Sequence, residues 1–122
     1  MLQTNIKRSL LLCLLIFTAL QAKNLHHEKY YQTQLCNTLG GEMEVVLQDR
    51  TRVDCLTDRY AIEVDFAKKW AESIGQSLYY GYMTHKKPAI ALIINLPKEQ
   101  RYLKRLDAMC KKYNIKLYLI KK

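Results

Sequence analysis

Three carboxylates lie close together in the sequence and could bind a metal ion. Asp54 belongs to the segment TRVDCL, residues 51–56, whereas Glu63 and Asp65 belong to YAIEVD, residues 60–65. Two carboxylates with a backbone carbonyl and water molecules suit Mg²⁺, because it is a hard ion that keeps part of its hydration. Such an ion can activate a water molecule and stabilise the charge that develops on a phosphodiester. Metal-assisted hydrolysis of a nucleic acid is therefore one chemistry that these acids could support.

Strand geometry predicts which of these acids come together. Residues two apart on a strand share a face, so Glu63 and Asp65 should point one way and Ile62 and Val64 the other. Asp54 is likewise expected opposite the apolar face of its own strand. If the two strands pair through the turn at residues 57–59, Asp54 and Glu63 come within reach of one cation.

Each acid also has a plainer interpretation. Asp65 directly precedes a predicted helix, so it could be the N-cap of that helix. Asp54 and Glu63 could be solvated acids near a sheet edge. They could also pair with nearby arginines, which are Arg50, Arg52 and Arg59.

Apolar spacing and turn residues predict eight elements that would position these side chains. The expected ranges are a helix at 27–39, strands at 42–48, 51–56 and 60–65, a helix at 66–83, a strand at 89–96, a helix at 97–113 and a strand at 115–120. Three strands joined by tight turns predict an antiparallel meander. The later strand–helix–strand repeats predict parallel neighbours. We therefore expect a single α/β domain of order α-β-β-β-α-β-α-β, with helices on both sides of a mixed sheet.

The helix over residues 66–83 has two predicted faces. Its apolar residues fall within one arc of the helical wheel and are expected to face the core. They are Ala67, Trp70, Ala71, Ile74, Leu78 and Tyr82. The opposite, solvent-facing side would carry Lys69, Ser73, Gln76 and Tyr80.

This order of elements and acids resembles the PD-(D/E)xK nuclease superfamily, also called restriction-endonuclease-like. The resemblance covers residues 26–120. Asp54 matches the aspartate of the motif, Glu63 matches its D/E position, and Glu28 matches a helical glutamate that often assists the metal site. RecB-type members add Gln-x-x-x-Tyr on the next helix, which Gln76 and Tyr80 match.

The motif lysine is the point of departure, because the position two after Glu63 holds Asp65. Some members carry this lysine on the following helix, where Lys69 matches and Lys68 is the alternative, about 100° away on the wheel.

The resemblance implies an Mg²⁺- or Mn²⁺-dependent nuclease with its metal on Asp54 and Glu63. Lys69 would orient water, Gln76 and Tyr80 would position the strand, and Glu28 would assist. The plainer alternative is that four of these side chains are solvated surface groups: Lys69, Gln76, Tyr80 and Glu28. The second functional hypothesis is an inactive nuclease-fold module that binds nucleic acid or an envelope protein.

Residues 1–22 have the plan of a secretory signal peptide. Lys7 and Arg8 form a positive region, residues 10–19 an apolar core, and residues 20–22 a cleavage site. We therefore expect an exported protein, periplasmic or secreted, whose folded domain is residues 23–122.

Three cysteines fall in that domain. Cys110 lies on the apolar face of the last predicted helix, which predicts a buried free thiol. Cys36 and Cys55 are then the better candidates for a disulfide, by elimination. Their spacings match no zinc motif.

The formal net charge of +9 attracts the chain to polyanions. Most of this charge lies late in the chain, on Lys86, Lys87, Lys98, Arg101, Lys104, Arg105, Lys111 and Lys112, beside His85. Such a face is usually solvated, but it could hold a phosphate backbone with no sequence reading.

Overall fold

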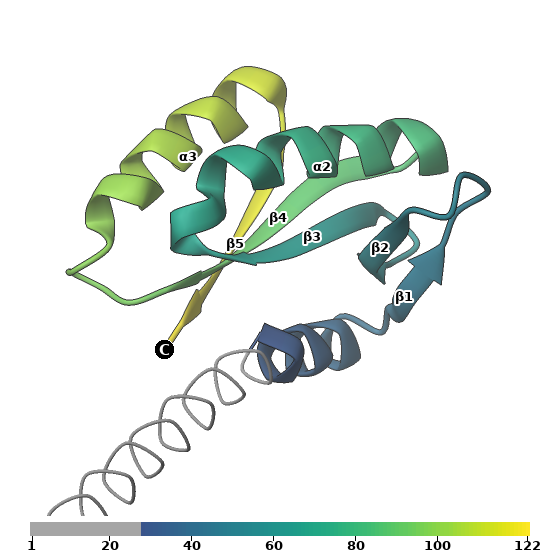
Figure 1. The fold of residues 1–122 in the computed structure, drawn as a ribbon, viewed down its shortest axis with the longest axis horizontal. Coiled ribbons are helices and arrows are strands. Elements are labelled where there is room, and N and C mark those ends of the chain that lie inside the picture. The colour runs from purple at the N-terminus through teal and green to yellow at the C-terminus, as the bar shows by residue number, and fades with distance from the viewer. Residues whose placement is uncertain (1–27) are drawn as a thin grey trace, which may run out of the picture.

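Five strands form one mixed sheet with helices on both faces in the computed structural model, which describes residues 28–122 (Figure 1). The elements are an N-terminal helix at residues 28–38, β1 (Glu42–Val46), β2 (Arg52–Leu56), β3 (Tyr60–Phe66), the 3-10 helix η1 (Ala67–Lys69), α2 (Trp70–Thr84), β4 (Lys87–Ile94), α3 (Gln100–Tyr113) and β5 (Lys116–Lys121). The predicted α/β domain and its order of elements are confirmed. The predicted signal peptide, residues 1–22, lies outside the described residues.

The strands lie in the sheet in the same order as in the chain. Strands β1, β2 and β3 form an antiparallel meander, whereas β3, β4 and β5 run parallel. Strand β4 is central to the parallel part, and its last six residues, 89–94, are all buried. A continuous apolar run is what a strand covered on both faces requires.

The N-terminal helix covers one face of the sheet, and α2 and α3 cover the other (Figure 1). A disulfide between Cys36 and Cys55 joins the N-terminal helix to β2, as predicted. Gly41 lies against this bridge, where a Cβ atom would meet Cys55 Sγ at 2.6 Å. Cys110 is a buried free thiol on α3, which confirms the second cysteine prediction.

Helix α2 packs on the sheet only partly through the face that was predicted. Its buried residues are Ser73, Ser77, Tyr80 and Gly81. Leu78 and Tyr82, expected in the core, are 36% and 76% exposed. Small side chains let the helix backbone approach the strands closely, and each buried serine hydroxyl donates to a carbonyl of its own helix. The predicted core face is therefore confirmed for Ala67, Trp70 and Ile74, and it is wrong for Ala71, Leu78 and Tyr82.

Helix α3 buries the side that its sequence indicates. Leu106 and Cys110 are buried, while Lys104, Arg105 and Lys112 are exposed. Across residues 28–122, no helix has the length and apolar character needed to cross a membrane.

Candidate functional site

Asp54 and Glu63 meet where β2 separates from β3. The register pairs only Cys55 with Ile62 and Leu56 with Ala61. Beyond these pairs, Asp54 Oδ2 accepts a 2.8 Å hydrogen bond from the Val64 backbone N–H. Glu63 is 6% exposed, and its carboxyl group hydrogen-bonds the carboxylate of Asp54. The predicted proximity of the two acids is confirmed.

These two acids share a proton at neutral pH. Burial, followed by the charges of Asp54, Asp65 and Glu28, raises the pKa of Glu63 to about 9. Burial also raises the pKa of Asp54 to about 6, against the opposing effect of the Val64 N–H. Since the charged form of a buried carboxyl is disfavoured, Glu63 stays neutral and donates its proton to the ionised Asp54.

Asp65 lies deeper than the N-cap interpretation requires. It is 3% exposed within β3 and accepts a 3.1 Å hydrogen bond from the Phe66 N–H. The N-cap of η1 is Phe66, and no side chain caps that helix, so the N-cap hypothesis is wrong. Burial raises the pKa of Asp65 to about 6, opposed by Lys69, whose Nζ lies 3.6 Å from Oδ1.

Lys69 therefore lies beside the acids, as predicted, although it is paired to Asp65 rather than to Asp54 or Glu63. Asp65 in turn raises the pKa of Lys69. The alternative that Glu63 is a solvated surface acid is wrong, because it is buried. Among residues 28–122, no arginine forms an ion pair with Asp54 or Glu63; Arg52 pairs with Glu44 at 3.5 Å instead.

The N-terminal helix brings two side chains to the acids. The charge of Glu28 raises the pKa of Asp54, Glu63 and Asp65, which places it near the cluster, as predicted. Gln32, one turn later and 4% exposed, is a residue that the sequence analysis missed. Its Nε2 donates to the Asp54 carbonyl at 2.9 Å and to Glu44 Oε1 at 3.0 Å. The spacing of four from Glu28 was the available signal.

Tyr80 approaches the acids from α2. It is 7% exposed and packs with Val53 and Ala61, so its expected solvent-facing position is wrong. Burial, and then the charges of Glu63 and Asp54, raise the pKa of Tyr80. Gln76 is exposed and hydrogen-bonds Tyr80 through its side chain. Of the predicted site residues, Gln76 and Lys69 are exposed at the outer surface of this cluster.

Carboxylate oxygens are the donors that Mg²⁺ and Mn²⁺ prefer. Within the described part of the chain, however, no three His, Cys, Asp or Glu side chains are arranged to hold a metal ion. The proton between Glu63 and Asp54 occupies part of their ligand capacity. The metal on these two acids stays a prediction.

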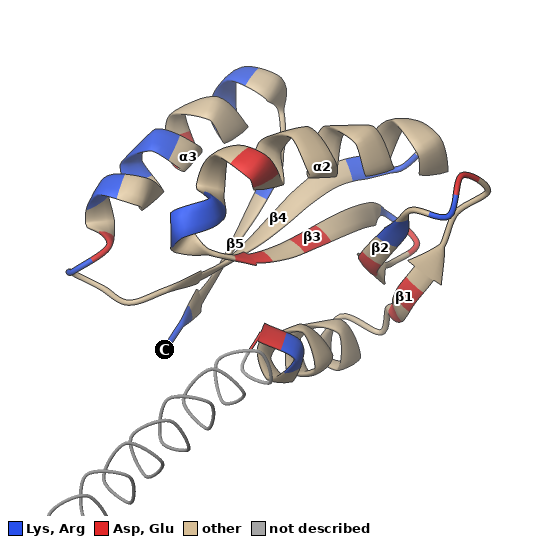
Figure 2. Ribbon diagram, in the orientation of Figure 1, with Lys and Arg blue, Asp and Glu red and all other residues tan. Residues whose placement is uncertain are grey.

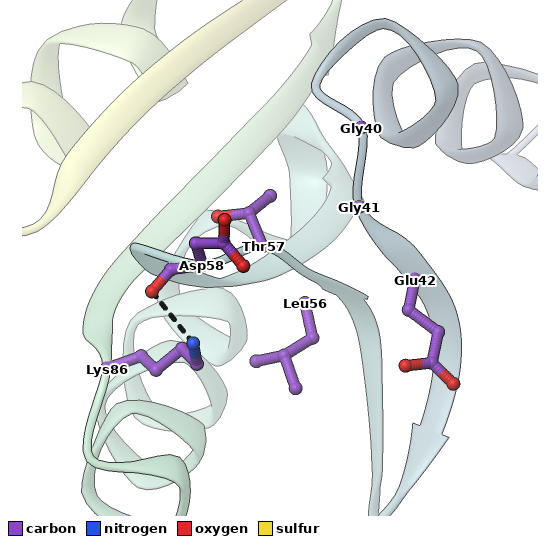
Figure 3. A pocket seen from close by; sticks show the side chains of 7 residues that line it. All are labelled: Gly40, Gly41, Glu42, Leu56, Thr57, Asp58 and Lys86. Atoms are coloured by element: carbon purple, nitrogen blue, oxygen red, sulfur yellow. Dashed lines mark hydrogen bonds between the residues drawn. The ribbon is translucent and has the colours of Figure 1, made fainter.

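A hollow of about 330 Å³ lies at the opposite end of the sheet, near the turn between β2 and β3 (Figure 3). Gly40, Gly41, Thr57 and Asp58 contribute to its lining. The Lys86 ammonium beside it donates to the Asp58 carbonyl at 2.7 Å. None of the predicted site residues lines this hollow, so it does not serve the carboxylate cluster.

Acidic and basic residues separate into two halves of the described chain. Residues 28–66 carry eight acids and four lysines or arginines, whereas residues 67–122 carry three acids and 13 lysines or arginines. Figure 2 shows the acids on β1, β2 and β3 and the basic residues along η1 and α3. The exposed positive charge therefore belongs mostly to residues 67–122, and two acids of the first half, Glu63 and Asp65, are buried.

Two curated relatives come from Acanthamoeba polyphaga mimivirus. The chain is 31% identical over 102 residues to "Putative KilA-N domain-containing protein L33", an alignment that covers 84% of this chain and 40% of the relative. It is 30% identical over 94 residues to "Putative KilA-N domain-containing protein R878", which covers 77% of this chain and 26% of the relative. The chain thus spans less than half the length of either protein. No family model and no solved structure matches it.

The comparisons correct the predicted function. Both relatives are named for a KilA-N domain, and neither name describes a nuclease. The prediction of an Mg²⁺-dependent nuclease is therefore contradicted. The mixed α/β sheet is present, but the relatives give no support to the PD-(D/E)xK resemblance. Asp65 at the lysine position and the shared proton on Glu63 agree with this correction.

Proposed function

We propose that this domain is a nucleic-acid-binding module that contacts the phosphate backbone and does not cut it. The relatives are named for a KilA-N domain, which is a DNA-binding type of domain. No family model matches the chain, so the candidate binding surface is defined by its own exposed residues.

The separation of charge is the observation that carries this proposal. The half formed by residues 67–122 exposes a series of basic side chains from the start of α3 onward: Lys98, Arg101, Lys104, Arg105, Lys111 and Lys112. Of these six, Lys111 forms the one ion pair within the described residues, with Asp107. A surface with this excess of positive charge attracts polyanions and releases their counterions on binding.

The carboxylate cluster has a structural role in this proposal. The Asp54 carboxylate accepts a hydrogen bond from the Val64 backbone N–H, and the Glu63 carboxyl group donates a second hydrogen bond to Asp54. The cluster lies in the acidic half, which would repel phosphate rather than hold it.

Fluorescence anisotropy of labelled single- and double-stranded DNA and RNA tests the proposal. We expect binding whose logarithmic affinity falls linearly with the logarithm of salt concentration, and intact oligonucleotides after incubation with Mg²⁺. Arg50→Gln with Arg59→Gln, which removes two positive charges outside the basic half, should leave the affinity nearly unchanged. Absence of binding at low salt, or an affinity that ignores salt, would contradict the proposal.

Export is a separate proposal that this function does not require. The Cys36–Cys55 disulfide supports it, because disulfides persist in oxidising compartments. Mass spectrometry of the mature N-terminus tests whether cleavage follows Ala22; a retained leader in a secreting host would contradict it. The comparisons do not point to an envelope protein partner, and that expectation stays a prediction.

A further inference from the structure

Four lysines line a groove of about 470 Å³ beside η1. Lys68 and Lys69 belong to η1, Lys98 precedes α3, and Lys122 follows β5. We call this feature the lysine groove. Its basic residues come from three separate parts of the chain, so it differs from the exposed row of basic residues along the single helix α3.

Sheet topology brings these lysines together. Phe66 ends β3, Asn95 follows β4 and Lys122 follows β5, and the three strands are parallel neighbours. The Lys122 N–H donates to the Ile94 carbonyl at 3.1 Å, which fixes the end of β5 beside the end of β4. The residues that follow these three strands therefore lie together at one edge of the sheet.

The groove carries more positive than negative charge. Four lysines line it together with one acid, Glu99, whose Oε2 accepts a 2.8 Å hydrogen bond from the Asn95 N–H. Asp65 offsets the charge of Lys69. Within residues 28–122, neither Lys68 nor Lys98 nor Lys122 has an ion-pair partner. A concave wall concentrates the field of the lysines that line it, so an anion would stabilise the site.

We propose that the lysine groove binds neighbouring phosphates of a nucleic-acid backbone, an inference that rests on the proposed function and assigns its contact surface. Lysine ammoniums hold phosphate as point charges, without the fixed geometry that arginine imposes. The Asn95 side chain, exposed at the groove, adds an amide donor for a phosphate oxygen.

The aromatic residue of the groove favours backbone contact over base stacking. The Lys122 Nζ lies 5.0 Å from the centroid of the Phe66 ring and covers its face. A base needs an open aromatic face on which to stack. The groove therefore reads charge rather than sequence, and its affinity should vary little between oligonucleotides of different sequence.

A pair of matched double variants tests the assignment. Lys68→Gln with Lys98→Gln removes two groove charges, one from η1 and one from the segment before α3, and within residues 28–122 neither lysine forms an ion pair that the change would break. Lys104→Gln with Lys112→Gln removes the same charge from the exposed side of α3. We expect the groove variant to bind about tenfold more weakly and to lower the salt slope by about two, whereas the control changes affinity by less than about threefold.

The outcomes separate this inference from the proposed function. If the wild-type chain binds no nucleic acid at low salt, the proposed function fails and the groove assignment fails with it. If the wild-type chain binds and the two variants lose equal affinity, the function stands and the groove assignment is overturned. Circular dichroism confirms that both variants are folded before they are compared.

Two further measurements locate the ligand and its source. Amide NMR shifts of Asn95 and Lys122 should change on adding an oligonucleotide, while the amide of Tyr113, at the far end of α3, should not. Inorganic phosphate and phosphatidylglycerol vesicles offer the same phosphate chemistry without a nucleic-acid backbone. Either of them displacing the oligonucleotide at equal phosphate concentration would overturn the assignment to nucleic acid.

Discussion

The Asp54 carboxylate accepts a 2.8 Å hydrogen bond from the Val64 N–H through its Oδ2. This bond lies beyond the last registered pair of β2 and β3, where a strand carbonyl would otherwise be the acceptor. The same aspartate offers its backbone carbonyl to Gln32, at 2.9 Å. One residue thus ties the N-terminal helix, β2 and β3 together where the sheet opens. This arrangement gives the acid a structural reason to be there without any catalysis.

Removing the Asp54 side chain should therefore destabilise the fold. We expect Asp54→Ala to lower the free energy of unfolding by roughly 1–3 kcal/mol, since a buried N–H loses its acceptor. Asp54→Asn keeps a side-chain oxygen for Val64 and should lose less. Urea denaturation at neutral pH measures both variants. Equal losses in Asp54→Ala and Asp54→Asn would show that the hydrogen bond to Val64 is not what matters.

Stability should fall as pH rises through the neutral range. The pKa of Glu63 is raised to about 9 in the folded state, so between its ordinary value of 4.5 and about 9 the folded chain binds more protons than the unfolded chain. The free energy of unfolding then decreases with pH, by up to about 1.4 kcal/mol per pH unit for one proton. The raised pKa values of Asp54 and Asp65, both about 6, act in the same direction at lower pH.

Glu63→Gln isolates this effect. The amide can still donate to Asp54 but does not titrate, so the variant should be more stable than the wild type near pH 8, by up to about 4 kcal/mol. Near pH 5 the two proteins should differ little. Urea midpoints of both proteins, measured in EDTA across pH 5–9, would show this pH-dependent difference in stability. Parallel pH profiles for the two proteins would rule out Glu63 as the titrating group.

The Mg²⁺ prediction has a thermodynamic test that needs no activity. A cation held by Asp54 and Glu63 would take the place of their shared proton, and in that case Mg²⁺ would raise the unfolding midpoint more at pH 8 than at pH 5. The shift should vanish in Glu63→Gln. Asp107→Asn, which alters an exposed acid paired with Lys111, should keep it. A midpoint shift of equal size in Glu63→Gln would mean that no cation binds at this pair.

Much of the fold followed from local patterns. The run of residues 89–96, which is apolar until Asn95, predicted a strand buried on both faces, and residues 89–94 of β4 are buried. The strand–helix–strand repeats predicted parallel neighbours, and β3, β4 and β5 are parallel. Such features depend on periodicity, which each segment carries by itself.

Two features depended on packing that periodicity does not report. The helical wheel placed Leu78 and Tyr82 in the core because they are apolar, but α2 packs through Ser73, Ser77 and Gly81. The wheel measures polarity, whereas close helix–sheet contact selects small volume. Asp65 was expected at a helix start, and it lies one residue earlier, inside β3.

The function was harder to predict than the fold because the acids fit two roles equally well. Asp54, Glu63 and Glu28 do converge, as the nuclease resemblance implied. Convergence alone does not distinguish a metal site from a buried acid pair that is satisfied by a proton and a backbone N–H. The difference lies in burial and in the neighbour of each oxygen, and neither is visible in the spacing of acids along the chain.

Replacing each of two glycines on α2 by alanine should change the free energy of unfolding in opposite directions. A Cβ on Gly81 would lie 3.1 Å from the Lys86 carbonyl oxygen and 3.2 Å from Pro88, where the helix meets the start of β4. A Cβ on Gly75 would meet nothing within 4 Å. Both changes gain the helical propensity of alanine, about 1 kcal/mol, but only Gly81→Ala crowds a packed contact, at a cost of roughly 1–3 kcal/mol. We expect urea denaturation to show Gly75→Ala more stable than the wild type and Gly81→Ala less stable. If both variants gain stability, Gly81 does not pack closely against the start of β4.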